Sequence, residues 1–280
     1  MTTLLIGFDS AWTAHKSGAI VGVIHSDDAK LAEFGPPQAV NFLQAGELIT
    51  TWQAEFKPHS TLVLIDQPTI VPNATGQRPV EHIVSSAVSL RRGGMQPANT
   101  SRDGMFCASA PVWRFLSRCG GAAANPLVSV ADTRVYETYP VLAMIAMGWL
   151  MEDSRPAGRL PKYNPARRKT FSMSDWRHVC ALTSGEFRNR GLNVIVKWID
   201  AIREKPSPRK LDQDGLDACI CLLVALHLAE GKDCLMVGDV ETGYIVVPDS
   251  AGLRAELDAR CCKTGRSPAR WLRVFRESGE

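Results

Sequence analysis

Two short apolar runs, each ending on an aspartate, are the clearest pattern in this chain. The first covers residues 3–9 and stops at Asp9, and the second covers residues 61–66 and stops at Asp66. An apolar run of this length predicts a largely buried strand, with the acid where the strand leaves the core. An ionised aspartate is costly to bury unless it is paired, caps a turn or holds a cation. Taken alone, Asp9 is better explained as the cap of the following turn.

The segment between the two runs predicts how these aspartates are placed. Residues 17–25 and 30–34 have the character of two further strands, so the first three strands form an antiparallel meander. Apolar positions in residues 39–56 then recur with a helical period. A helix between two strands normally makes them parallel neighbours, whose carboxyl ends share one edge of the sheet. We therefore expect Asp9 and Asp66 side by side, at the edge where open α/β sheets bind ligands.

The rest of the chain alternates long polar segments with helical patterns. Residues 69–125 are rich in Gly, Pro, Ser and Arg and predict a long loop that contains a helix at 79–90. A short strand is predicted to end on Glu137, and Pro140 then fits the first turn of a buried helix. The remaining expected elements are a helix at 141–151, a loop at 153–169, helices at 174–190, 194–204 and 211–230, a hairpin at 238–247, a helix at 252–261 and a short element at 268–275.

Acidic residues also open the long apolar helix predicted at 211–230. Asp214 and Asp217 are three residues apart, so they share one face of the helix. Acids favour the positive end of a helix, and Asp212 is a plausible N-cap. Capping explains one of these three acids. It does not explain two more at the start of a helix that is otherwise apolar.

Composition sets broad limits on this protein. A chain of 280 residues with 45% hydrophobic residues can bury a full core, and we expect one domain over 1–280 with insertions around 69–130 and 151–190. The formal net charge of +3 is too small to indicate a nucleic-acid binder, although local clustering of basic residues could still form a basic groove. We find no membrane-spanning stretch, no signal peptide and no C-x-x-C pair among the 8 cysteines, which favours a reduced, cytoplasmic protein. The oligomeric state stays open.

The two long polar segments carry many cations. Guanidinium and ammonium groups in functional loops bind phosphate or carboxylate groups well. The competing interpretation is a solvated, charged surface that keeps the protein soluble. The candidate substrate-binding residues are Arg78, Arg91, Arg92, Arg102, Lys162 and Arg168.

The acids at predicted strand ends and at the helix start suggest a metal site. Magnesium and manganese ions prefer oxygen ligands, and a cluster of carboxylates is stable only if something neutralises it. Two such ions a few ångströms apart can activate water and stabilise the leaving oxygen of a phosphodiester. The candidate catalytic and metal-binding residues are Asp9, Asp66, Glu137, Asp214 and Asp217, with Mg²⁺ or Mn²⁺ as the expected cofactor.

The order of these motifs resembles a known family. Gly7-Phe8-Asp9, Ile65-Asp66-Gln67-Pro68, Glu137-Thr138-Tyr139-Pro140 and Asp214-Gly215-Leu216-Asp217-Ala218 are similar to motifs of the DUF429 family, whose members are predicted to be ribonuclease H-like nucleases. The resemblance implies an α/β fold of the ribonuclease H-like type, with a central mixed sheet flanked by helices. It also implies metal-dependent cleavage of a nucleic-acid phosphodiester, with Asp9 as the bridging ligand. Asp66 or Glu137 would be the second ligand, and Asp214 and Asp217 would supply the remaining positions.

Two other classes of function fit the same residues. A phosphoryl-transfer or small phosphate-ester enzyme would use the acids in the same way, with the arginine loops as anion clamps. A non-catalytic module that binds nucleic acid or protein would keep the fold without the chemistry. The six histidines lie far apart, and none pairs with a Ser or Cys motif, so nucleophilic triad chemistry is not indicated.

Overall fold

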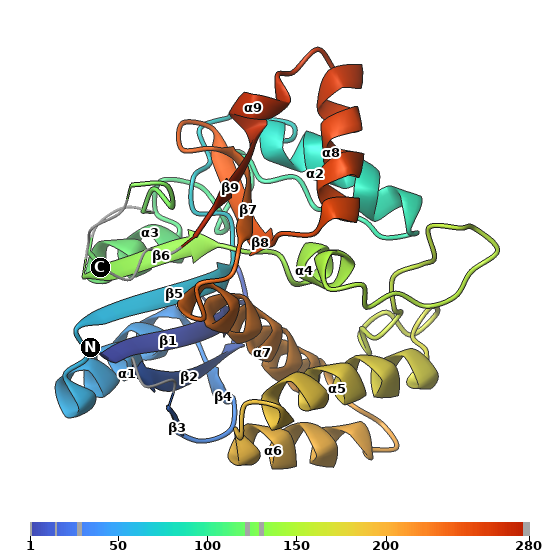
Figure 1. Ribbon diagram of the computed structural model, residues 1–280. Helices are drawn as coiled ribbons and strands as arrows, with labels where there is room; N and C mark the ends of the chain where they lie inside the picture. The colour runs from blue at the N-terminus through green and yellow to red at the C-terminus, as the bar shows by residue number, and fades with distance from the viewer. Residues whose placement is uncertain (1, 15, 27–29, 121–123, 129–131, 277–280) are drawn as a thin grey trace.

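The main sheet of the protein is mixed, with its parallel strands on one side and its antiparallel strands on the other (Figure 1). The computed structural model describes residues 2–14, 16–26, 30–120, 124–128 and 132–276. Within this part of the chain, the strand order is β3-β2-β1-β5-β6, and β4 also pairs with β2. The strands are β1 (Thr2–Asp9), β2 (Gly18–Ser26), β3 (Leu31–Glu33), β4 (Gln38–Val40), β5 (Ser60–Asp66) and β6 (Thr133–Glu137).

The pairing of β1 confirms the expected meander and crossover. Strand β1 pairs antiparallel with β2 and parallel with β5, so the chain returns beside its first strand after helix α1 (Phe42–Phe56). Helix α1 begins three residues later than its apolar period indicates, because residues 38–40 pair with β2 as β4. Asn41 then caps the helix by accepting a hydrogen bond from the backbone N–H of Gln44.

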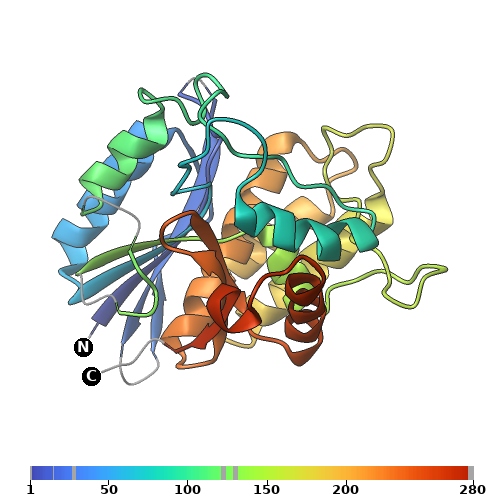
Figure 2. The same ribbon diagram turned by 90° about the horizontal axis from the view of Figure 1, so that it is seen from above.

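Two apolar cores lie on opposite faces of this sheet because side chains alternate along each strand. Ile6 and Phe8 of β1 face α1 and α3 (Pro111–Arg118), whereas Leu5 of β1 and Leu64 of β5 belong to the larger core around α7 (Lys210–Ala229). Figure 2 shows α1 and α3 on one side of the sheet and α7 on the other. The described residues therefore form a mixed α/β structure with a central sheet flanked by helices.

Helix α7 lies unusually close to β1, and Gly7 makes this possible. A Cβ atom at Gly7 would lie 2.1 Å from the carbonyl oxygen of Ala218 and 2.4 Å from the backbone nitrogen of Leu222. Only a residue without a side chain allows this approach. The sequence predicted Asp212 as the N-cap of α7, and this prediction is wrong. The cap is Arg209, and Asp212, three residues into the motif, accepts a 2.8 Å hydrogen bond from the Arg209 N–H.

A second, smaller sheet lies beside the first (Figure 1). It has the order β8-β7-β9, and helices α2, α8 and α9 pack around it. The expected hairpin is present, but its first strand starts four residues earlier than predicted. The elements are α2 (Pro79–Leu90), β7 (Cys234–Asp239), β8 (Gly243–Pro248), α8 (Ala251–Lys263), α9 (Pro268–Trp271) and β9 (Leu272–Phe275).

The helices after β5 differ from the prediction at two places. Helix α3 interrupts the segment that was expected to be loop after α2. The buried helix α4 (Pro140–Ala146) ends early, since the chain turns at Gly148 with φ +74°. Two further helices, α5 (Met173–Arg188) and α6 (Asn193–Arg203), match their predicted positions within two residues. Among the described residues, no helix is both long enough and apolar enough to span a bilayer.

We expect the Gly7→Ala substitution to lower the free energy of unfolding by about 1–3 kcal/mol, because the added methyl group forces β1 and α7 apart. Urea denaturation followed by circular dichroism measures this change. Gly185→Ala in α5 is the control, since its Cβ meets open space and alanine is favoured in a helix. Equal stability of Gly7→Ala and the wild type would show that α7 does not depend on this contact.

Candidate functional site

The first two acid-tipped strands bring their aspartates together. Asp9 and Asp66 are direct partners in the parallel pairing of β1 with β5, so their side chains leave the sheet on the same face. Asp9 lies on the face of Gly7, which is the face that α7 covers. The carboxyl ends of the two strands therefore present adjacent carboxylates beneath the start of α7.

Helix α7 adds a third acid and a cation to this pair. Burial raises the pKa of Asp9 well above its ordinary value, and the charges of Asp217 and Asp66 raise it further, while Lys210 opposes them. Burial and Asp217 likewise raise the pKa of Asp66. Burial raises the pKa of Asp217 to about 6, although Lys210 lowers it. Asp214 lies at the edge of the group, where it accepts a hydrogen bond from Lys210. We call Asp9, Asp66, Asp214 and Asp217 the acid cluster.

Asp9 and Asp66 differ from the other acids in having no compensating donor. Among the described residues, no hydrogen bond or ion pair reaches either carboxylate. Asp217, in contrast, accepts hydrogen bonds from Tyr163 Oη at 2.7 Å and from Gln213 Nε2 at 2.6 Å. The other buried acids also accept hydrogen bonds, and they are Glu81, Glu137, Asp175, Asp212, Asp214 and Asp239. Two adjacent carboxylates without donors are the part of the structure that a cation would stabilise most.

Glu137 has a different environment from the acid cluster. It pairs with Ile65 in the β5–β6 register, so it is out of phase with Asp66 along the pleat. Its carboxylate receives two hydrogen bonds from Arg78, at 2.6 and 2.8 Å, and one from the Thr69 N–H at 3.1 Å. Of the two acids that the sequence offered for the middle position, Asp66 is therefore the one beside Asp9.

Arg78 does not face a substrate, and this corrects its interpretation as a loop arginine that contacts phosphate. Its side chain is 1% exposed and forms ion pairs with Glu81 and Glu137. Burial in a low-dielectric interior requires such pairing, and two carboxylates on one guanidinium satisfy it. Arg78 thus joins the start of α2 to the end of β6.

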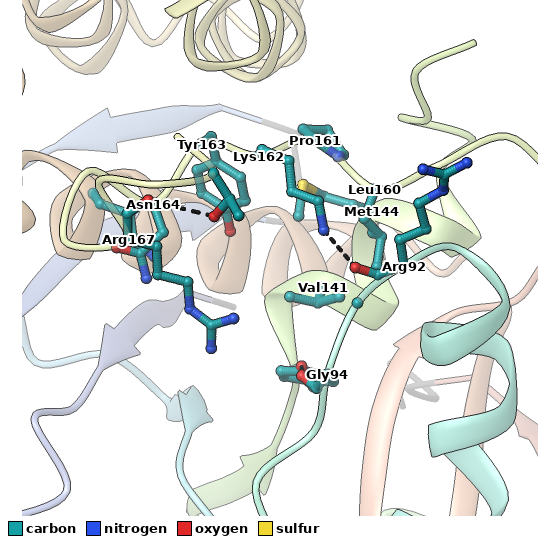
Figure 3. A pocket seen from close by; sticks show the side chains of 14 residues that line it. Arg92, Gly94, Val141, Met144, Leu160, Pro161, Lys162, Tyr163, Asn164 and Arg167 are labelled. Carbon is teal, nitrogen blue, oxygen red and sulfur yellow. Dashed lines mark hydrogen bonds between the residues drawn. The ribbon is translucent and has the colours of Figure 1, made fainter. Parts of the chain in front are cut away.

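A pocket of about 380 Å³ lies next to the acid cluster (Figure 3). Tyr163 and Gln213, the two residues that donate to Asp217, both line it. The negative charges of Asp66 and Asp217 also raise the pKa of Tyr139, another lining residue, after the larger effect of burial. The pocket and the acid cluster therefore share a wall.

The predicted loop cations divide into two groups. Arg92 and Lys162 line the pocket, and the Lys162 ammonium donates to the backbone carbonyl of Arg92 (Figure 3). Arg91 instead forms a two-bond ion pair with Glu256 of α8, and Arg102 donates to the backbone carbonyl of Pro97. Arg168 is exposed and lies outside the residues that line the pocket.

Several residues of this region could not be selected from the sequence. Lys210 is the first residue of α7 and precedes its acids, and only its helical spacing of four from Asp214 hinted at a contact. In the dense basic loop, the sequence suggested Tyr163 as a ring that could stack on a base, not as the hydrogen-bond donor to Asp217, and it gave no reason to prefer Arg167 over Arg168. The sequence gave no reason to assign Gln213 to the site, because a glutamine beside two aspartates is ordinary at a helix start.

The donor set around the two free carboxylates suits a hard divalent cation. Among the described residues, no three His, Cys, Asp or Glu side chains converge into a ready-made ligand set. Magnesium ions are commonly held by only one or two carboxylates, with waters and substrate phosphates completing the shell. Asp9 and Asp66 supply two carboxylates side by side, so the residues present fit a hard divalent cation.

Comparison with known families assigns the chain to one family. A family model described as "Protein of unknown function (DUF429)" matches residues 7–242, which is most of the chain, so the protein belongs to this family. The matched span includes the whole acid cluster and the described residues that line the pocket. No curated protein and no solved structure matches the chain.

Proposed function

We propose that this member of the DUF429 family is a divalent-metal-dependent hydrolase that cleaves a nucleic-acid phosphodiester. The observation that carries the proposal is the pair of neighbouring carboxylates, Asp9 and Asp66, which have no donor among the described residues. A turn cap does not account for them, because a capping carboxylate accepts a backbone hydrogen bond. Lys210 relieves part of the electrostatic repulsion within the acid cluster, and protons or a bound metal ion would relieve the rest.

The arrangement of the strands supports a ribonuclease H-like assignment of the fold. An antiparallel meander leads through α1 to a parallel strand beside β1, and a further parallel strand follows. This order is the one that the resemblance to ribonuclease H-like nucleases implies, with Asp9 on the central strand. The ribonuclease H-like fold is therefore part of the proposal.

Each residue of the site has a role that follows from its contacts. Asp9 and Asp66 would hold Mg²⁺ or Mn²⁺, and such an ion polarises a phosphoryl oxygen and lowers the pKa of bound water. Tyr163 and Gln213 fix the orientation of Asp217 through their hydrogen bonds, so this carboxylate is ready as a further oxygen ligand. Lys210 holds Asp214 and offsets part of the negative charge. The cations of the pocket would attract the phosphate groups of the substrate.

Hydrolysis of small phosphate esters by the same acids is the second candidate function. The pocket favours it, because a cavity of about 380 Å³ is within the range of roughly 300–1,000 Å³ that encloses small ligands. In that case, the cations of the pocket would bind the whole substrate rather than one part of a polymer.

Incubation of the purified protein with labelled single- and double-stranded DNA and RNA tests the proposal. We expect cleavage of at least one polymer with Mg²⁺ or Mn²⁺ and none in EDTA. We also expect either metal at millimolar concentration to raise the melting temperature in EDTA-free buffer, because the ion binds the folded protein.

Asp258→Asn is the matched control for this assay, since it removes a carboxylate from the exposed side of α8. It should behave as the wild type in cleavage and in the thermal shift. Hydrolysis of nucleotides or sugar phosphates without polymer cleavage would favour the second candidate. The absence of any metal-dependent hydrolysis, together with an unchanged melting temperature, would overturn both.

A further inference from the structure

Of the three cations that line the pocket, Arg92 pairs with Asp153, whereas Lys162 and Arg167 form no ion pair with an acid among the described residues. Lys162 donates to a backbone carbonyl, and no hydrogen bond or ion pair of the Arg167 side chain is present among the described residues. Burial lowers the pKa of Lys162, and the neighbouring charges of Arg159 and Arg167 lower it further. Two neighbouring cations without an acidic partner attract an anion, since an anion relieves their repulsion.

The pocket also has apolar and aromatic lining residues. Val141 and Met144 line the pocket together with the ring of Tyr139, whose hydroxyl group donates to the backbone carbonyl of Gly94. Figure 3 shows Val141 and Gly94 facing the loop that carries Lys162 and Arg167. A pocket that combines an aromatic ring and apolar side chains with two cations suits a ligand that has a flat or apolar part and an anionic part.

The pocket lining also carries an unused hydrogen-bond acceptor. Gln213 is 6% exposed, and its Oε1 atom is buried without a partner among the described residues, while its Nε2 atom donates to Asp217. A buried amide oxygen of this kind normally finds a donor, such as an N–H or O–H group of a ligand. Gln213 itself is one of the residues that line the pocket, and its hydrogen bond to Asp217 joins the pocket to the acid cluster.

We propose that the pocket binds a single unstacked nucleotide at the end of a nucleic-acid strand, with Arg167 and Lys162 as its phosphate contacts. The inference rests on the proposed function, because it names the substrate of the same site. The cavity of about 380 Å³ has room for one nucleotide, and its two cations without an acidic partner, Lys162 and Arg167, belong to the same loop. A stacked duplex presents phosphates along a continuous backbone and would not enter a pocket of this size.

Binding without catalysis tests the pocket directly. Isothermal titration with a nucleoside monophosphate in EDTA should show one site in the wild type. Arg167→Ala should weaken binding about tenfold or more, because it removes a charged hydrogen-bond donor. Arg168→Ala is the matched control, since Arg168 is the next residue of the same loop and does not line the pocket. Equal binding by the two variants, or none by the wild type, would overturn the assignment.

Comparison of linear and circular single strands tests the requirement for an end. With Mn²⁺ present, a linear strand should be shortened stepwise, and a circle of the same sequence should react at least about tenfold more slowly. Circles cleaved as fast as linear strands would overturn the end-binding inference and leave the proposed function intact. If neither polymer is cleaved but Arg167 is still needed to bind the monophosphate, the proposed polymer cleavage fails and the nucleotide pocket stands.

Discussion

The Asp9→Asn variant is expected to lose metal-dependent cleavage by about 100-fold or more and to become more stable than the wild type in EDTA. Loss of activity follows because the amide removes the charge that would hold the cation, and a loss of about 3 kcal/mol of transition-state stabilisation corresponds to about 100-fold in rate. Stability rises because Asp9 no longer repels Asp66 and Asp217. We therefore expect the free energy of unfolding of Asp9→Asn in EDTA at neutral pH to exceed that of the wild type.

The same variant should change how stability depends on pH in the absence of metal. The folded protein keeps protons on Asp9, Asp66 and Asp217 at pH values where the unfolded chain has released them. Where the folded state binds more protons, stability falls as the pH rises. The wild type should therefore lose stability from about pH 4, the ordinary carboxyl value, to above pH 6, the pKa of Asp217. Asp9→Asn should lose less over this interval.

Urea denaturation at several pH values, with EDTA or with Mn²⁺, measures these effects. In the wild type, Mn²⁺ should restore the stability that is lost above pH 6, because the ion replaces the protons. Asp258→Asn, an exposed acid, should follow the wild type in every condition. An Asp9→Asn variant that is less stable than the wild type in EDTA would contradict repulsion at this site, and retained cleavage would exclude Asp9 as a ligand.

The central part of the fold could be predicted because its sequence signals are local and agree with one another. The apolar runs of β1 and β5 are strands, the amphipathic segment between them is a helix, and their parallel pairing follows from that helix. Strand β4 was missed because its residues Gln38–Val40 are partly polar and pair at a sheet edge. Helix α3 was missed because it lies in a segment rich in Gly, Pro and Ser, and only its buried positions reveal its pattern.

The acids of the site were also predicted in part. The sequence predicted Asp9, Asp66 and Glu137 alike, but only Asp9 and Asp66 lie together, and the pleat of the sheet is the physical reason. Asp9, Asp66 and Glu137 all end apolar strands, which the sequence shows. Which face each side chain takes depends on the register between strands, which the sequence does not show. Asp9 pairs with Asp66, whereas Glu137 pairs with Ile65 and so lies out of phase.

The loop cations were the least predictable part of the site. Composition marks a basic loop, but it gives no information on which side chain turns inward. Arg78 is buried between two glutamates, and Arg91 is paired with Glu256, more than 160 residues away in sequence. Arg167 and Arg168 are adjacent and chemically identical, yet only Arg167 lines the pocket. Such differences depend on tertiary contacts alone.

Arg78→Ala is expected to lower the free energy of unfolding by about 3–5 kcal/mol, which is the range for removing one partner of a buried ion pair. The reason is that Glu81 and Glu137, both nearly inaccessible to solvent, would lose the guanidinium between them. Thermal and urea denaturation measure the loss. Arg114→Ala, an exposed arginine of α3, should remain within about 0.5 kcal/mol of the wild type.

Glu137→Gln separates the role of Glu137 in this ion pair from a role in metal binding. Gln keeps the shape of the side chain but removes the charge that Arg78 contacts, so stability should fall while the thermal shift with Mn²⁺ stays close to that of the wild type. Asp66→Asn should behave in the opposite way, with higher stability in EDTA and a reduced shift with Mn²⁺. If Glu137→Gln abolished the shift and Asp66→Asn kept it, Glu137 would be the second metal ligand, and Arg78 would position that ligand.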